Sequence, residues 1–236
     1  MRLALALAWL AAATAHANCT PGMLDYERAW PSGGATDVAT NARVLVQRFG
    51  TTDFRERPVR YTLVPDTGPA VPLRVALDLR SGSRNMHQRT LVLSPAIELV
   101  ANTRYTLMVG RDPEPQSFTT AAGADTTPPS AGRLRARGFA RLVMGCGPAD
   151  RIRIDVEGTD APWVRLRIAR DEAALAAGRF EGETILVVER GGISFGHDMC
   201  IGNWGLEPGQ RLFASTILMD VSSNELAAGT LVLDAR

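Results

Sequence analysis

The chain has 236 residues, of which 45% are hydrophobic, so it is long enough for one large folded domain or for two of about 100 residues each. Its 26 basic residues, all of them arginine, are balanced by 25 acidic residues, which leaves a net charge of +1. A charge this close to zero argues against a nucleic-acid-binding protein, because such proteins carry an excess of positive charge.

The N-terminus predicts a secretory signal peptide over residues 1–17. Arg2 supplies a positive charge, residues 3–13 are apolar, and alanines at 13, 15 and 17 suit cleavage by signal peptidase. Cleavage before Asn18 is the preferred interpretation, and cleavage before His16 also fits the rule. The apolar run is too short to remain as a membrane-spanning helix, and Asn18, directly before the first cysteine, does not suit lipid attachment. We therefore expect an exported chain, periplasmic, on the cell surface or extracellular, with no membrane span.

Alternation of apolar and polar residues with a period of two predicts short strands along the rest of the chain. Arginines occupy many of the polar positions, as expected for strand faces in water. The clearest alternations are at Val71–Arg80, Tyr105–Val109, Arg151–Val156 and Val164–Ile168. Turn-forming sequences separate the strands at Pro31–Gly34, Pro65–Gly68, Arg80–Ser83 and Glu207–Gly209.

Only one segment is expected to be helical, between Asp171 as its N-terminal cap and Gly178 at its end. Many short strands with frequent turns and almost no helix are typical of β-sandwiches. Residues 119–130 have no apolar period, and a strand cannot run through the two prolines at 128 and 129. We therefore expect an all-β protein of two tandem sandwich domains, at residues 18–123 and 131–236, joined by a linker at 124–130.

Several segments of the first half follow one another in the order found in a known domain family. They are Pro31–Val38, Asn41–Phe49, Leu91–Pro95, Leu99, Tyr105–Val109 and the closing Phe118–Thr120. Together they resemble a bacterial Ig-like domain of the S-layer (SbsA) type. The resemblance implies a sandwich with Tyr105 buried at a corner and its hydroxyl bonded to nearby backbone. The loop at Arg111–Gln116 is shorter than in that family, so a function carried by the longer loop does not transfer.

The second half carries a different set of segments. They are Asp125–Pro129, Trp163–Ile168, Leu206–Leu212, Asp220–Asn224 and Gly229–Leu233. Together they resemble a fibronectin type III-like module, in which Leu212 replaces the usual tyrosine. The resemblance implies a scaffold or binding module and no particular ligand.

The three cysteines, Cys19, Cys146 and Cys200, are an odd number, and export would allow disulfides to form. We expect Cys146 to pair with Cys200, because both lie in the second domain. Cys19 would then be free or would pair with another chain. A bond between Cys19 and one of the other two is the alternative.

The segment Gly192–Gly196 matches the Gly-x-Ser-x-Gly pattern, which in some hydrolases presents a nucleophile, here Ser194, on a turn between a strand and a helix. No helical period follows the motif, and His197 comes three residues after the serine, where hydrolases of this kind place it far downstream. The favoured interpretation is a glycine-rich hairpin or loop, so no catalytic residue is assigned.

Two kinds of ligand site, for a metal ion and for a carbohydrate, have single features of the sequence in their favour. Cleavage before His16 would place a free amine and an imidazole on one residue, which suits copper(II), and periplasmic copper carriers of the CopC type are small Ig-like sandwiches with an N-terminal histidine. No second histidine or methionine cluster supports that site, and no calcium-loop pattern is present, so no metal or cofactor is assigned. Trp30, Trp163 and Trp204 could line a carbohydrate-binding surface, although packing in or near the cores is the expectation for each.

These observations favour a non-enzymatic protein of the cell envelope or the medium, with a structural or adhesive role and a protein or glycan of the envelope as its partner. Two alternatives remain from the residues. One is a periplasmic binder of a small ligand, either copper through His16 or a carbohydrate. The more remote one is a serine hydrolase at Ser194.

Overall fold

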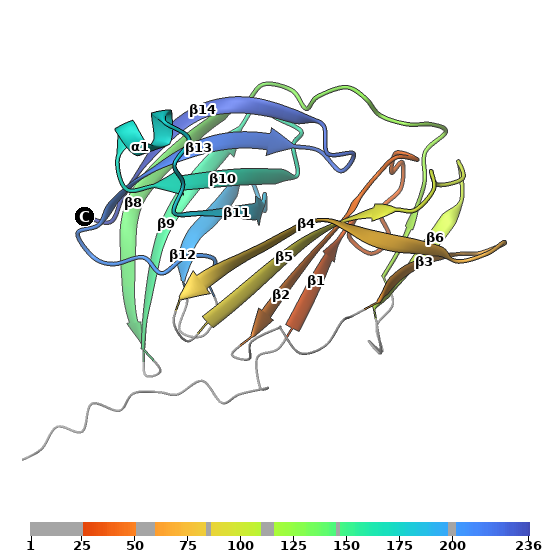
Figure 1. The fold of residues 1–236 in the computed structure, drawn as a ribbon, viewed down its shortest axis with the longest axis horizontal. Coiled ribbons are helices and arrows are strands. Elements are labelled where there is room, and N and C mark those ends of the chain that lie inside the picture. The colour runs from red at the N-terminus through yellow and green to blue at the C-terminus, as the bar shows by residue number, and fades with distance from the viewer. Residues whose placement is uncertain (1–25, 51–59, 84–85, 110–115, 145–146, 198–201) are drawn as a thin grey trace, which may run out of the picture.

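Almost all of the regular structure is β-sheet, which confirms the all-β prediction (Figure 1). The computed structural model describes residues 26–50, 60–83, 86–109, 116–144, 147–197 and 202–236. The predicted signal peptide and Cys19, Cys146 and Cys200 lie outside these residues. Within the described ranges, no helix is long and apolar enough to cross a membrane.

The first half forms one antiparallel sheet, in the order β1-β2-β5-β4-β3-β6-β7, that folds over on itself into a sandwich. Strand β4 belongs to both layers, because its first residues pair with β3 and the rest pair with β5, and a bulge between Val75 and Leu77 bends it. The layers β1-β2-β5-β4 and β3-β6-β7 correspond to the ABED and CFG sheets of an Ig-like domain. The bounds are β1 (Tyr26–Trp30), β2 (Val44–Gly50), β3 (Tyr61–Pro65), β4 (Val71–Ser83), β5 (Met86–Pro95), β6 (Arg104–Val109) and β7 (Gln116–Thr119).

Tyr105 occupies the corner between β5 and β6. Its ring is 1% exposed and stacks on Phe118, with 6.1 Å between the ring centroids. Its hydroxyl accepts a hydrogen bond of 2.9 Å from the backbone N–H of Val100. The buried ring and the hydroxyl-to-backbone bond expected of Tyr105 are therefore confirmed.

The second half forms a sandwich of two separate sheets, β8-β9-β12 and β11-β10-β13-β14. Alternate residues of these strands point inward, as the period-two pattern predicts, and build an apolar cluster that includes Ile152, Ile154, Leu166, Phe195 and Leu212. The bounds are β8 (Arg133–Met144), β9 (Gly147–Glu157), β10 (Trp163–Ala169), α1 (Glu172–Ala176), β11 (Gly182–Val187), β12 (Gly192–His197), β13 (Arg211–Met219) and β14 (Glu225–Asp234).

The local predictions hold for the helix and fail for one turn. The Asp171 side chain caps α1 by accepting a 2.7 Å hydrogen bond from the N–H of Ala174, and Gly178 follows the helix with a φ of 68°. The predicted turn at Arg80–Ser83 is wrong, because these residues belong to β4 and Gly82 pairs with position 87 of β5. Gly82 has a φ of 126° and bridges to the backbone of Trp204, so this glycine serves a close backbone approach within a strand.

The two sandwiches pack face to face, so four sheet layers stack with an apolar cluster in each of the three gaps (Figure 1). In the middle gap, Leu45 and Val92 of the first sandwich meet Trp163 and Ile185 of the second. The buried side chain of Gln47 donates a 2.7 Å hydrogen bond across this gap to the backbone oxygen of Ile185. Apolar burial and a buried polar contact together hold the two halves as one body.

The segment between the sandwiches is fastened to both of them. The side-chain amide of Asn41 donates to the backbone oxygen of Asp125 at 2.7 Å, and the N–H of Asp125 donates back to Asn41 at 2.9 Å. From the second sandwich, the amide of Asn224 donates to the same oxygen of Asp125 at 3.1 Å, and the hydroxyl of Ser222 donates to Asn41 at 3.1 Å. This network fixes the direction in which the second sandwich leaves the first.

Candidate functional site

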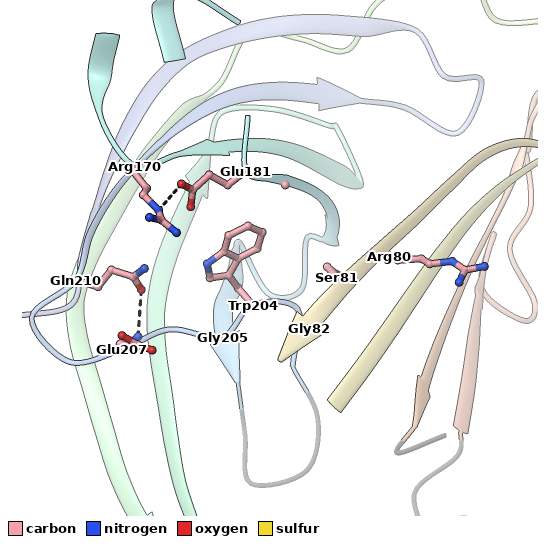
Figure 2. Close-up of a pocket in the computed structure, with 10 residues that line it drawn as sticks. Arg80, Ser81, Gly82, Arg170, Glu181, Trp204, Gly205, Glu207 and Gln210 are labelled. Carbon is pink, nitrogen blue, oxygen red and sulfur yellow. Dashed lines mark hydrogen bonds and ion pairs between the residues drawn. The ribbon is translucent and has the colours of Figure 1, made fainter. Parts of the chain in front are cut away.

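A pocket of about 530 Å³ opens where the end of β4 approaches the second sandwich (Figure 2). Three segments that are far apart in the sequence line it. They are Arg80–Gly82 of β4, then Arg170, Glu181 and Gly182 around the β10–β11 connection, then Trp204, Gly205, Glu207 and Gln210 between β12 and β13. Because both sandwiches contribute, the pocket exists only when they are packed together.

Trp204 is the aromatic wall of the pocket, and its position is set from two sides. Its ring stacks on the buried ring of Phe195, with 5.9 Å between centroids and 27° between planes. The preceding residue, Asn203, holds the chain against β12, accepting a 3.0 Å hydrogen bond from the N–H of Gly196 and donating one of 2.9 Å to the oxygen of Ser194. The indole is therefore held in one orientation before any ligand arrives.

Gly182 allows the indole to lie against the backbone of β11. A Cβ at this position would lie 2.6 Å from Cζ3 and 2.7 Å from Cη2 of Trp204, closer than real contacts of this kind. Any larger side chain at Gly182 must therefore displace the ring. Glycine is needed here for space, as is usual where a bulky group approaches a backbone closely.

Some of the polar groups of the pocket are paired with one another. Arg170 forms an ion pair with Glu181, and the backbone N–H of Glu207 donates to Oε1 of Gln210 at 3.2 Å. Figure 2 shows the guanidinium of Arg80 directed away from Trp204. The ion pair cancels two of the charges, and the remaining charges of Arg80 and Glu207 are opposite in sign, so the lining beside the indole has no net charge in total. Such a site suits a small uncharged ligand with one apolar face and several hydroxyl or amide groups.

The structure separates the three tryptophans proposed for a carbohydrate surface. Trp163 is fully buried in the gap between the sandwiches, and Trp30 is half-buried and packs against the same cluster. Trp204 is the one that lines the pocket. The expectation of packing in or near the cores holds for all three, because Trp204 also packs against the core of the second sandwich while it lines the pocket.

Ser194 lies in the middle of strand β12 and pairs with Arg153 of β9. A nucleophile elbow requires a tight turn from a strand into a helix, and no described residue after β12 forms a helix. Ser194 and the neighbouring glycines thus belong to a strand, as in the favoured hairpin interpretation. His197 lies at the end of the same strand, with Nε2 3.6 Å from the Asp150 carboxylate.

The remaining site predictions concern residues that the structure does not describe. His16, the candidate copper ligand, and Cys146 and Cys200, the predicted disulfide, lie outside the described residues. Among the described residues, no group of three or more histidine, cysteine, aspartate or glutamate side chains could hold a metal ion.

Comparison with known proteins does not identify a relative. No family model matches the sequence, and no curated protein matches it. Two solved structures of a pullulanase from Anoxybacillus sp. LM18-11, one of them complexed with maltotriose, align at 11% identity with TM-scores of 0.24 and 0.23. The alignments cover 84% of this chain and 25% of the pullulanase chain, so this chain spans about a quarter of the length of that enzyme. Likeness at these scores carries no argument about fold or function.

Proposed function

We propose that this chain is an exported, non-enzymatic binding protein of the cell envelope, in which two packed sandwiches present a ligand pocket at their junction. The observation that carries the proposal is the pocket built by β4 together with Trp204. Its aromatic wall is fixed before binding, and the buried contacts between the sandwiches hold both sides of it in place. Pre-organised concave sites of this size are typical of small-ligand binding.

A saccharide unit is the ligand class that fits the pocket. A sugar ring has a face of C–H groups, which can lie on the indole of Trp204, and a rim of hydroxyls, which can bond to Glu207 and Gln210. The pairing of Arg170 with Glu181 leaves no concentrated positive charge for an anionic ligand. If this saccharide belongs to a glycan of the cell envelope, its binding in the pocket would attach the protein to the envelope, which is a structural or adhesive role.

A glycan array followed by calorimetric titration tests this proposal on the full exported chain. We expect binding of a neutral oligosaccharide, weakened about tenfold or more by Trp204→Ala, because that change removes at least about 1.4 kcal/mol of contact. Gly182→Ala should weaken binding as well, since its methyl group displaces the indole without removing it. Phe180→Ala is the matched control, because this exposed aromatic residue does not line the pocket.

Two outcomes contradict the proposal directly, and a third concerns the control variant. One is the absence of binding to any neutral saccharide at millimolar concentration. The other is a saccharide whose affinity is unchanged by both Trp204→Ala and Gly182→Ala while the variants keep the thermal stability of the parent. Equal losses in Trp204→Ala and Phe180→Ala would also count against the pocket.

A further inference from the structure

The outermost layer of the second sandwich, β8-β9-β12, has one face on the apolar core and one face in water. Its inner face supplies Ile152, Ile154 and Phe195 to the core. Its outer face lies on the side away from the first sandwich, because strands β10, β11 and β13 contribute to both this core and the cluster in the middle gap, which places their sheet between the two. No described strand covers this outer face, which is separate from the pocket.

Arginines dominate this outer face. Arg133, Arg135 and Arg137 alternate with inward residues along β8, and Arg151 and Arg153 do so along β9. Two carboxylates, Asp155 and Glu157, share the face, which leaves an excess of three positive charges in a chain whose net charge is +1. The near-neutral total thus conceals a strong local asymmetry.

The acidic residues do not neutralise the face. Asp155 is shared by two arginines, since Nε of Arg137 and Nε of Arg153 both contact its carboxylate, the latter at 3.1 Å. The hydrogen bond from Arg137, supported by that from Arg153, holds the pKa of Asp155 below its usual range. Arg133 and Arg135 make no side-chain hydrogen bond or ion pair within the described residues, so both guanidinium groups are available to a partner.

The spacing of the arginines suits an extended polymer. Residues two apart on a strand are about 7 Å apart, so the arginines of β8 and those of β9 form two short rows. Glu157 and Asp155 lie opposite Arg133 and Arg135, and a bulge between Ala136 and Phe139 interrupts the register. Guanidinium groups bind carboxylate and sulfate groups through paired hydrogen bonds. The exposed large apolar residues of the described chain lie elsewhere, apart from Leu142 and Val143 at the end of β8, so this face lacks the apolar anchors of a protein interface.

We infer that the outer face of β8-β9-β12 binds a linear anionic polysaccharide through the rows of arginines headed by Arg133 and Arg135. The inference goes beyond the proposed function, because it concerns another surface and a charged polymer. The inference rests on the complementary charges of the arginines and the polymer, and the polymer would lie along the strands. A neutral saccharide in the pocket and an anionic one on this face could then be held by one rigid body.

Titration of the full chain with heparin, a sulfated polysaccharide, tests the inference at 50 mM and 150 mM salt. We expect binding at the lower salt that weakens steeply at the higher salt, because released counterions dominate such affinities. The double variant Arg133→Gln/Arg135→Gln should weaken binding about tenfold. It should also reduce the slope of log affinity against log salt concentration by about one to two, one for each lost ionic contact. Both arginines lack an ion pair with any described residue, so their replacement breaks no ion pair in that part of the fold.

The matched control is Arg60→Gln/Arg74→Gln, which removes two exposed arginines of the first sandwich and changes the net charge equally. It should change the affinity for heparin less than twofold. Equal weakening by both double variants would overturn the inference, because net charge alone would explain it. Lack of heparin binding at 50 mM salt would overturn it, as would tighter binding of double-stranded DNA than of heparin. None of these results bears on the Trp204 pocket, so the two proposals can fail independently.

Discussion

The two layers of each sandwich are joined in different ways in the first and the second half of the chain. In the first, β4 passes from one layer to the other, so the backbone itself joins them, and Tyr105 fastens the corner to the N–H of Val100. In the second, the two sheets share no strand, and the position that corresponds to Tyr105, the second residue of β13, is Leu212. Leu212 is fully buried and contributes apolar contact only.

The difference shows that one architecture can rest on separate sets of interactions. In the first sandwich, the continuous backbone of β4 and the hydrogen bond of Tyr105 join the two layers. The second depends more on its apolar core and on the gap that it shares with the first sandwich, and the predicted disulfide would add to these. We therefore expect changes at the shared gap and at the cysteines to act on the second sandwich, and changes at the tyrosine corner to act on the first.

Trp163→Ala should have the largest effect on stability, because it removes a side chain through which the second sandwich packs against the first. The side chain is fully buried between the layers, so its removal should cost about 5 kcal/mol. Calorimetry should show the parent unfolding in one transition and the variant in two, the second sandwich melting first. Val143→Ala, at a residue that is 78% exposed, is the control and should change stability by less than about 0.5 kcal/mol. A single unshifted transition for Trp163→Ala would mean that the gap does not couple the two halves.

The predicted Cys146–Cys200 disulfide is the next test. The described residues that flank the two cysteines lie at the same end of β8-β9-β12, because His197 pairs with Asp150, three residues from Gly147. Closing a loop of this length should stabilise the second sandwich by about 4 kcal/mol in the chain-entropy model. In the Trp163→Ala background, where the two transitions are separate, the double variant Cys146→Ser/Cys200→Ser should lower only the transition of the second sandwich. Peptide mapping without reduction checks the pairing, and a fragment linked to Cys19 within one chain would contradict it.

Alternation along the strands was sufficient to predict an all-β sandwich but not the packing between the halves. Strands with arginine at every second position, such as β9, do expose that face as predicted. The shared gap has a different signal, continuous apolar runs in which both faces of a strand are buried. These runs are Val44–Val46, Leu91–Leu93, Ile185–Val188 and Ile217–Met219. The runs could have indicated a second buried face, although they do not say which strands meet across it.

The pocket could not be predicted from the sequence for a related reason. Gly182, Trp204 and Gly82 come from three segments whose proximity follows from the packing of the two sandwiches. A glycine that makes room for a ring on a distant segment has no local pattern, and Gly82 suggested a turn instead. The role of Tyr105 was predicted from the resemblance to a family, and the contact that it implies is local, because Val100 is only five residues away.

Tyr105→Phe should have the smallest effect on stability, and that effect should be confined to the first sandwich. The ring and its stacking on Phe118 remain, so the loss is the hydrogen bond from Val100, worth about 1 kcal/mol, with the freed N–H near the surface. The transition of the first sandwich should shift down while that of the second stays, measured best in the Trp163→Ala background where the two are separate. Tyr61→Phe is the matched control, because its hydroxyl lies 3.5 Å from Glu27, at the limit of a hydrogen bond. If both substitutions cost the same, the hydrogen bond at the corner contributes nothing specific to the first sandwich.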